Sequence, residues 1–259
     1  MACKCQKSLI SKDITMRSPL SCPSKVILTG GTSGIGAEML ELLLVAGHEV
    51  IVLARRASSL EPRNGMEAID IDLSNGAAIK AVAVDLAARH PDASVLINNA
   101  ALQYPVALTD PDFDPEQMEA EVAINLLAPA LLTHALLPAL RRQGAGAAIV
   151  NVSSGLAYFP KQQSALYCAT KAALHSFSQS LRYQLEADGV AVIEAILPLV
   201  ETPMTEGRGS GKISAREAAT AILAGVRKGR TEILIGKAKL LPLISRIAPA
   251  LGCKIMRGS

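Results

Sequence analysis

The sequence predicts an α/β protein, organised as one domain or as two small ones. Short apolar, β-branched segments recur along the 259-residue chain, and longer segments with apolar residues at helical spacing lie between them. Half of the residues are apolar and 19% are charged, so the chain can bury a large core. The predicted strands cover residues 25–29, 49–53, 66–70, 94–97, 147–152, 190–196 and 232–235.

The first strand leads into a glycine-rich turn, Gly30-Gly-Thr-Ser-Gly34-Ile-Gly36, and a helix follows that ends at Gly47. A strand, a glycine turn and a helix form the context that a dinucleotide-binding loop requires. Glycines permit close approach of the backbone, and the helix N-terminus offers free N–H groups to a pyrophosphate. The spacing is GxxxGxG rather than GxGxxG, so an ordinary βα turn remains the alternative at this point.

The second strand is followed by Arg55 and Arg56, with no acidic residue at its end. In nucleotide-binding folds, an acidic residue here binds the ribose 2′-hydroxyl, whereas an arginine accommodates a 2′-phosphate. We therefore predict NADP(H) as the cofactor, with NAD(H) less favoured. The alternative is that both arginines lie on a solvated loop. The connection to the third strand contains Pro62 and Gly65 and can hold about one turn of helix.

Polar residues also follow the third and fourth strands. Asp72 and Leu73 come after the third strand, and Ser74 is the predicted N-cap of a helix that runs to His90. The fourth strand ends in the run Asn98-Asn99-Ala100-Ala101.

A long helix is predicted from Glu116 to about Arg142, and it contains Asn125 amid apolar residues. Pro129 should clash with the carbonyl of Asn125 and kink this helix. The Asn125 side chain could satisfy the freed backbone groups or hold a water molecule, and both alternatives stay open.

The fifth strand and the helix after it carry the residues with the clearest chemistry. The strand ends near Ser154, and a helix over 165–187 carries Tyr167 and Lys171 on one face. A free phenol has a pKa near ~10. A neighbouring cation lowers that pKa, which suits general acid–base work. Taken alone, the YxxxK pair could equally be two surface residues of an amphipathic helix.

The sixth strand leads into Leu197-Pro-Leu-Val-Glu-Thr202, and the glycine-rich residues 203–212 are predicted to form a mobile flap. Ser214 is expected to cap a helix that runs to Arg227. Four residues suggest an apolar wall of a substrate pocket, and these are Tyr158, Phe159, Leu199 and Met204.

Composition argues against several other functions. The net charge is only +3, tryptophan is absent, and no basic run is interleaved with aromatic residues, so nucleic-acid binding has no support. The five cysteines show no CxxC pair, and the four histidines have no metal-ligand spacing. We interpret the histidines, His175 among them, as structural. We predict reduced thiols, no metal site and a cytoplasmic location. No apolar run reaches the roughly 18 residues that a membrane span requires.

Together, these motifs resemble the short-chain dehydrogenase/reductase family in its compact form. Residues 29–36 match the TGxxxGxG turn of that family, and Asp72 with Leu73 matches its adenine-contacting pair. Residues 98–101 match NNAG except that Ala101 replaces the final glycine. The match to the PG…T segment after the sixth strand is looser, although Thr202, the expected carboxamide contact, is retained. All four members of the catalytic tetrad are matched, by Asn125, Ser154, Tyr167 and Lys171.

Within that family the sequence is most similar to the bacterial DltE-like oxidoreductases. The resemblance implies a single Rossmann-type, doubly wound domain with a seven-stranded parallel sheet and helices on both faces. It also implies a homodimer or homotetramer. The residues that it assigns to the cofactor are Gly30, Thr32, Ser33, Gly34, Ile35, Gly36, Arg55, Arg56, Asp72, Leu73, Asn99, Ala100, Tyr167, Lys171 and Thr202.

The resemblance also implies a role for each member of the tetrad. Ser154 would donate a hydrogen bond to the substrate oxygen, and Tyr167 would exchange a proton with that oxygen. Lys171 would lower the Tyr167 pKa and bind the ribose, while Asn125 would hold a water molecule. We predict an NADP(H)-dependent oxidoreductase that acts on the carbonyl/alcohol pair of a small molecule. The alternative is a catalytically silent nucleotide-binding regulatory protein, and the intact tetrad argues against it.

The predicted domain covers residues 25–236, with a disordered extension over residues 1–24 and a C-terminal tail over residues 237–259. Residues 1–24 are rich in Lys and Ser and lack an apolar segment, so a weak organelle transit sequence is the alternative there. The tail is rich in leucine and isoleucine. We expect it to pack over the substrate entrance rather than to lie on a membrane.

Overall fold

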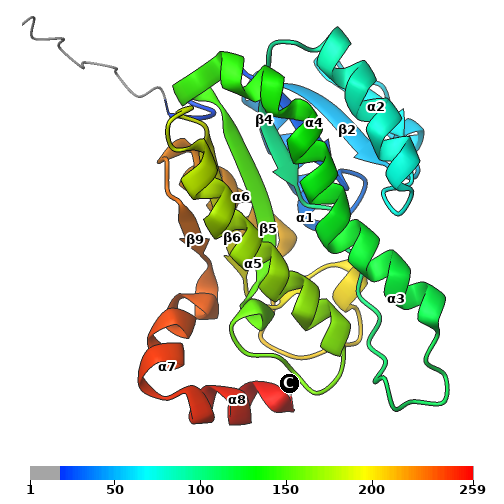
Figure 1. Cartoon of the computed structure of the whole chain (residues 1–259), viewed down its shortest axis with the longest axis vertical. Helices are drawn as coiled ribbons and strands as arrows, with labels where there is room; N and C mark the ends of the chain where they lie inside the picture. Colours follow the sequence, from blue (N-terminus) through cyan, green and yellow to red (C-terminus); the bar gives the residue numbers. More distant parts are fainter. Residues whose placement is uncertain (1–17, 259) are drawn as a thin grey trace, which may run out of the picture.

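Seven parallel strands form the central sheet of the protein (Figure 1). The structure, a computed structural model, describes residues 18–258. The strand order across the sheet is β3-β2-β1-β4-β5-β6-β9, which confirms the predicted seven-stranded fold. The bounds are β1 (Lys25–Thr29), β2 (Glu49–Ala54), β3 (Met66–Asp70), β4 (Ala93–Asn98), β5 (Ala148–Ser154), β6 (Ala191–Leu197) and β9 (Glu232–Leu234).

After β3, the chain crosses back over the sheet, and β4 pairs with the free edge of β1. From β1, the strands β2 and β3 extend the sheet to one side, whereas β4, β5, β6 and β9 extend it to the other. In open parallel sheets, ligands bind at the carboxyl ends of the strands where the order reverses. The ends of β1 and β4 therefore mark the expected position of a site.

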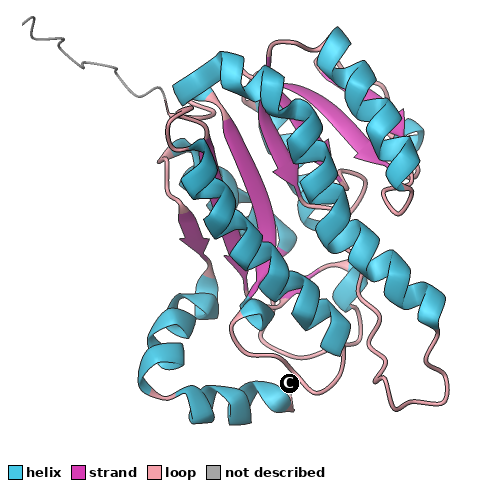
Figure 2. Ribbon diagram, viewed as in Figure 1, coloured by secondary structure: helices cyan, strands magenta, loops and turns pink. Residues whose placement is uncertain are grey.

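Five helices cover the two faces of the sheet. On one face lie α1 (Gly34–Val45) and α6 (Ala215–Arg227), which pack against each other. The other face, which is the near face in Figure 2, carries α2 (Gly76–Arg89), α4 (Ala128–Gln143) and α5 (Ala165–Leu185).

Side chains of each strand alternate between two cores, as the twofold period of an extended chain requires. In β1, Val26 and Leu28 lie in the core beneath α1 and α6, and Ile27 lies in the core beneath α2 and α4. Because both faces of the sheet are buried, the strands are continuous apolar runs in the sequence.

The predicted long helix is interrupted, as the position of Pro129 indicated. It consists of α3 (Pro115–Val122), a π-helical turn η2 (Ala123–Leu127) and α4. Pro129 has no N–H group to donate and its ring crowds the carbonyl of Asn125, so the chain takes a wider turn there. By length and composition alone, the run Pro115–Gly146 could cross a membrane. Its buried residues Leu132, Leu136 and Leu140 lie in the core of the domain.

One predicted helix cap was wrong. The N-cap of α2 is Asn75, whose side chain accepts hydrogen bonds from the N–H groups of Ala77 and Ala78. The hydroxyl of Ser74 instead donates to Asp72 at 2.7 Å. The short turn predicted between β2 and β3 is present as η1 (Ala57–Ser59).

Both ends of the described chain are folded against the domain or into helices. Residues 1–17, which include Cys3 and Cys5, lie outside the described residues. Within residues 18–24, which were predicted to be disordered, Leu20 is only 3% exposed and belongs to the core. At the other end, the tail folds into η6 (Gly236–Leu240), α7 (Leu241–Ile247) and α8 (Pro249–Arg257). The other short elements are η3 (Gly144–Gly146), η4 (Gly155–Ala157), β7 (Val200–Glu201), η5 (Pro203–Thr205) and β8 (Ile213–Ser214).

Candidate active site

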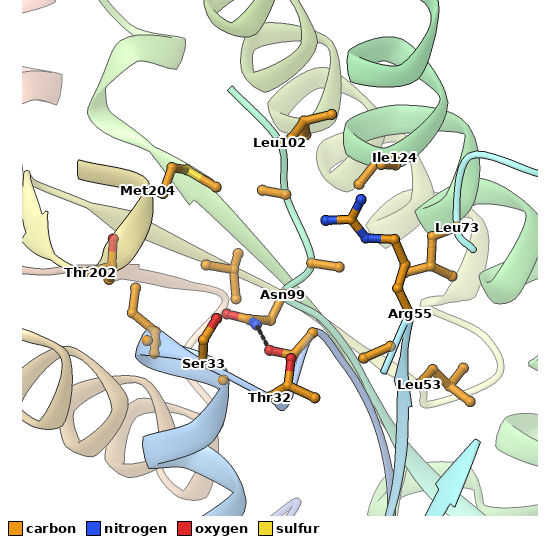
Figure 3. Close-up of a pocket in the computed structure, with 18 of the residues that line it drawn as sticks. Thr32, Ser33, Leu53, Arg55, Leu73, Asn99, Leu102, Ile124, Thr202 and Met204 are labelled. Atoms are coloured by element: carbon orange, nitrogen blue, oxygen red, sulfur yellow. Dashed lines mark hydrogen bonds between the residues drawn. The ribbon is translucent and has the colours of Figure 1, made fainter. Parts of the chain in front are cut away.

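A cavity of about 330 Å³ lies where the order of the strands reverses (Figure 3). Every residue that was predicted to bind the cofactor lines it. These residues are Gly30, Thr32, Ser33, Gly34, Ile35, Gly36, Arg55, Arg56, Asp72, Leu73, Asn99, Ala100, Tyr167, Lys171 and Thr202. The further lining residues are Leu53, Ala54, Ile71, Ala101, Leu102, Ile124, Val152, Ser153, Leu197, Pro203 and Met204. Several of these further residues are neighbours in the sequence of the predicted ones, such as Ala54 before Arg55 and Ile71 before Asp72.

Two glycines of the turn are required by close packing of the main chain. Gly30 has a φ of +71°, and a Cβ there would lie 2.9 Å from the Cα of Ala100. A Cβ on Gly36 would lie 1.9 Å from the carbonyl oxygen of Gly30. Glycine is the residue that tolerates such approaches without displacing the turn.

Thr29 and Asn99 join this turn to the end of β4. The Thr29 hydroxyl accepts hydrogen bonds from the N–H groups of Asn99 (2.9 Å) and Ala100 (3.0 Å). The Asn99 amide donates to the carbonyl oxygens of Thr29 (3.0 Å) and Gly30 (3.2 Å). These bonds fix the two loops that form the floor of the cavity.

The first turn of α1 fits a phosphate group. Ser33 occupies the N-cap without a side-chain hydrogen bond, and the first intrahelical bond runs from the N–H of Ala37 to the carbonyl of Ser33. The N–H groups of Gly34, Ile35 and Gly36 thus lack intrahelical partners at the edge of the cavity. Unpaired N–H groups and the positive end of the helix dipole form a typical anion site.

The end of β2 places positive charge on the opposite wall. Figure 3 shows the Arg55 side chain extending into the cavity beside Leu73. Across residues 18–258, neither Arg55 nor Arg56 forms an ion pair. The carboxylate of Asp70 is held by the N–H and hydroxyl of Ser58, at 2.8 and 2.6 Å. Two unpaired guanidinium groups fit a 2′-phosphate better than a bare ribose hydroxyl.

Tyr167 and Lys171 lie one helical turn apart on α5, with the Lys171 Nζ 5.6 Å from the centre of the Tyr167 ring. The ammonium group is buried and donates to the carbonyl oxygen of Val152 at 2.9 Å. Burial lowers the pKa of Lys171 to about 8. Burial also raises the pKa of Tyr167 above its usual value, while the adjacent Ser154 hydroxyl acts in the opposite direction. The predicted lowering of the Tyr167 pKa by Lys171 stays a prediction, and burial acts against it.

Ser154 lies beside Tyr167 and Asn125 lies beside Thr170, but neither is among the residues that line the cavity. The hydroxyl of Ser154, the last residue of β5, accepts a hydrogen bond from the N–H of Leu156 at 3.2 Å. The Asn125 side chain accepts from the N–H of Leu102 and donates to its carbonyl, both at 2.8 Å. It also donates to the Thr170 hydroxyl at 3.2 Å. The backbone partner is therefore Leu102 in the loop after β4 rather than a group freed at the kink, and the water molecule at Asn125 stays a prediction.

The family model described as short chain dehydrogenase matches residues 24–212, well over half of the sequence. The chain belongs to the short chain dehydrogenase family. Two relatives match most of it. The uncharacterized oxidoreductase DltE of Bacillus subtilis is 35% identical, over 80% of this chain and 86% of the relative. Sulfoacetaldehyde reductase 2 of Chromohalobacter salexigens is 30% identical, over 74% of this chain and 79% of the relative.

Solved short chain dehydrogenases have the same fold. A short chain dehydrogenase from Burkholderia cenocepacia in complex with NADP superposes with a TM-score of 0.83 at 28% identity. The match covers 92% of this chain and 99% of the other. A short-chain dehydrogenase from Sphingobium yanoikuyae in complex with NADPH superposes with a TM-score of 0.75 at 26% identity. That match covers 88% of this chain and 94% of the other.

In this short chain dehydrogenase, a buried acidic residue lies near the tetrad that the sequence did not predict. Glu194 of β6 is fully buried, and its carboxylate lies 2.6 Å from Nδ1 of His175 on α5. This hydrogen bond raises the pKa of His175. The ring of Tyr158 packs against the same imidazole, with a centroid distance of 5.3 Å. A glutamate inside an otherwise apolar strand was the signal in the sequence, because a buried charge requires a partner.

The suggested apolar wall is only partly present. Met204 lines the cavity, but Phe159 is 2% exposed and packs against Gly252 of α8. The predicted flap over 203–212 has one side-chain hydrogen bond within itself and one to the loop after β4. Lys212 donates to the carbonyl of Thr205 at 2.6 Å, and Arg208 donates to the Gln103 side chain at 3.0 Å.

Three cysteines lie in the described part of the chain. Cys22, Cys168 and Cys253 are free, and Cys168 is buried. Within residues 18–258, no group of three or more His, Cys, Asp or Glu side chains is arranged to hold a metal ion.

Proposed function

We propose that this short chain dehydrogenase interconverts a carbonyl group and an alcohol of a small molecule, with NADP(H) as cofactor and Tyr167 as general acid/base. The observation that carries the proposal is that Tyr167 and Lys171 line the same cavity as the glycine turn. Relatives of the same fold in complex with NADP and NADPH support the choice of cofactor. A relative named as a reductase of an aldehyde supports the type of reaction.

The residues of the cavity fit such a cofactor group by group. The unpaired N–H groups at the start of α1 would bind the pyrophosphate, and Arg55 with Arg56 would bind the 2′-phosphate. Asp72 and Leu73 would contact the adenine, and Thr202 the carboxamide. When bound, the nicotinamide would supply or accept the hydride.

Tyr167 would move the proton. Burial raises its pKa, so the phenol keeps its proton at neutral pH, which is the form that protonates a substrate oxygen during reduction. Ser154 would donate a hydrogen bond to the same oxygen. Lys171, with a pKa lowered to about 8, exchanges protons near neutral pH and would resupply the phenol. Lys171 would also bind the ribose hydroxyls, and Asn125 would hold a water molecule on the path to solvent.

The proposal includes the cellular form of the enzyme. We propose a homodimer or homotetramer located in the cytoplasm, as the resemblance to the family indicated. Neither property enters the chemistry at Tyr167.

The test is a panel of aldehydes and ketones, screened with the purified chain by the consumption of NADPH. We expect turnover of at least one carbonyl compound, and faster turnover with NADPH than with NADH. A chain that binds NADPH tightly but turns over no member of the panel, and no corresponding alcohol with NADP⁺, would favour the catalytically silent regulatory protein.

A further inference from the structure

The C-terminal helices expose a stripe of large apolar side chains. Leu240, Leu243, Ile247, Leu251 and Ile255 are between 55% and 73% exposed, and we call them the apolar stripe. A spacing of four residues places Leu243 and Ile247 on one side of α7, and Leu251 and Ile255 on one side of α8. A group of large exposed apolar side chains indicates a surface that a binding partner would cover.

Another side of the same helices is packed against the domain. A Cβ on Gly252 would lie 2.3 Å from the Phe159 ring, and one on Gly155 would lie 2.6 Å from a methyl group of Leu241. The N–H of Gln162 donates to the carbonyl of Arg257 at 3.1 Å. The tail is therefore held against the loop between Ser154 and Tyr167. The apolar stripe does not take part in these contacts.

The segment that carries the stripe is basic. From residue 235 to residue 258 the chain contains no Asp or Glu, and its basic residues are Lys237, Lys239, Arg246, Lys254 and Arg257. All of them are exposed. Among the residues that the structure describes, none of them forms an ion pair.

Contrary to the expectation from the sequence, we propose that α7 and α8 dock the protein on an anionic lipid bilayer. A helix that lies in the membrane interface buries an apolar side at the acyl boundary and places Lys and Arg among the anionic headgroups. The apolar stripe and the basic residues of the same segment have this composition. A second copy is a poorer partner for this surface, because a twofold contact would bring two basic segments together with no acidic residue in either.

Docking would orient the catalytic domain. The helices lie at the end of the molecule toward which the strands point (Figure 1) and contact the loop between Ser154 and Tyr167. The bilayer would thus lie beside that loop. This inference goes beyond the proposed oxidoreductase activity and does not depend on it.

The experiment is flotation of the full chain with two kinds of vesicle, phosphatidylcholine alone and phosphatidylcholine mixed with phosphatidylglycerol. We expect binding to the mixed vesicles, weakened by added salt, and little binding to phosphatidylcholine alone. The double variant Ile247→Asn/Leu251→Asn should weaken binding by at least about tenfold. The double variant Lys239→Glu/Lys254→Glu should do the same. Because all four side chains are exposed, both variants should fold, which circular dichroism checks.

Matched controls lie on α2, at the opposite end of the sheet. Val84→Asn and Lys80→Glu change an exposed apolar and an exposed basic residue there, and both should bind vesicles like the wild type. The proposal is overturned if the wild type ignores anionic vesicles, or if the tail variants bind as well as the α2 controls. It is also overturned if the Ile247/Leu251 variant splits a wild-type oligomer in sedimentation without vesicles, because a second copy would then cover the stripe.

Discussion

The cavity has two halves, one around the glycine turn, called the nucleotide half, and one around Tyr167, called the Tyr167 half. The main chain sets the shape of the nucleotide half, whereas side chains from distant segments set the shape of the Tyr167 half. Gly30, Gly36 and the amides of Asn99 and Ala100 meet through backbone atoms and one threonine hydroxyl. Around Tyr167, the neighbours are Lys171 and Ser154, and the loop between them is held by Phe159 against Gly252. A main-chain site tolerates few substitutions, while a side-chain site can change its substrate without changing its fold.

The largest effect that would test this contrast is expected at Gly36. The change Gly36→Ala should destabilise the fold by about 3 kcal/mol, because the new methyl group would overlap the carbonyl oxygen of Gly30. Gly146→Ala is the matched control, since a Cβ there meets no atom within 4 Å. It should change the unfolding free energy by less than about 0.5 kcal/mol. Chemical denaturation measures both, and a Gly36 variant as stable as the control would break the contrast.

A smaller effect is expected at the one part of the nucleotide half that depends on long side chains. Arg55→Ala should weaken NADPH binding roughly 10- to 100-fold, the value of a charge-assisted hydrogen bond to phosphate. NADH, which lacks the 2′-phosphate, should lose much less. Arg63→Ala, which removes an arginine paired with Glu41 outside the cavity, should change neither. Calorimetric titration would decide, and equal losses for both cofactors would contradict our interpretation of the end of β2.

The smallest effect concerns the hydrogen-bonded pair of His175 and Glu194, close to Lys171. The hydrogen bond to Glu194 raises the pKa of His175, so its contribution to stability is complete below the unfolded pKa near ~6.5 and is lost as the pH rises through the folded pKa. As the pH rises from below about 6.5 through the folded pKa of His175, the wild type should therefore lose more stability than His175→Gln. His134→Gln, at an exposed position, serves as control. If the wild type and His175→Gln have the same pH slope, the pair carries no charge-dependent stability.

The parts that the sequence predicted are those fixed by neighbours in the chain. The glycine turn, the ends of the strands and the spacing of Tyr167 and Lys171 follow from local geometry, and the structure places them along one cavity. The interruption at Asn125 followed from Pro129 in the same way.

Contacts between distant segments could not be predicted. The pairing of Glu194 with His175, the use of the Val152 carbonyl by Lys171 and the burial of Phe159 beneath α8 each join residues from different elements. The Asn75 cap was missed for a local reason, because Ser74 and Asn75 are both good N-cap residues and only the hydrogen bonds of Asp72 distinguish them.

The most direct test of the account is the change Tyr167→Phe, which removes the phenolic hydroxyl and keeps the ring. We expect turnover to fall roughly 10²- to 10⁴-fold, the usual contribution of a general acid, while the dissociation constant of NADPH stays unchanged. Tyr183→Phe, at a position of the same helix that is 75% exposed, should retain full activity. A Tyr167 variant with the turnover of the wild type would contradict the central claim that this phenol moves the proton.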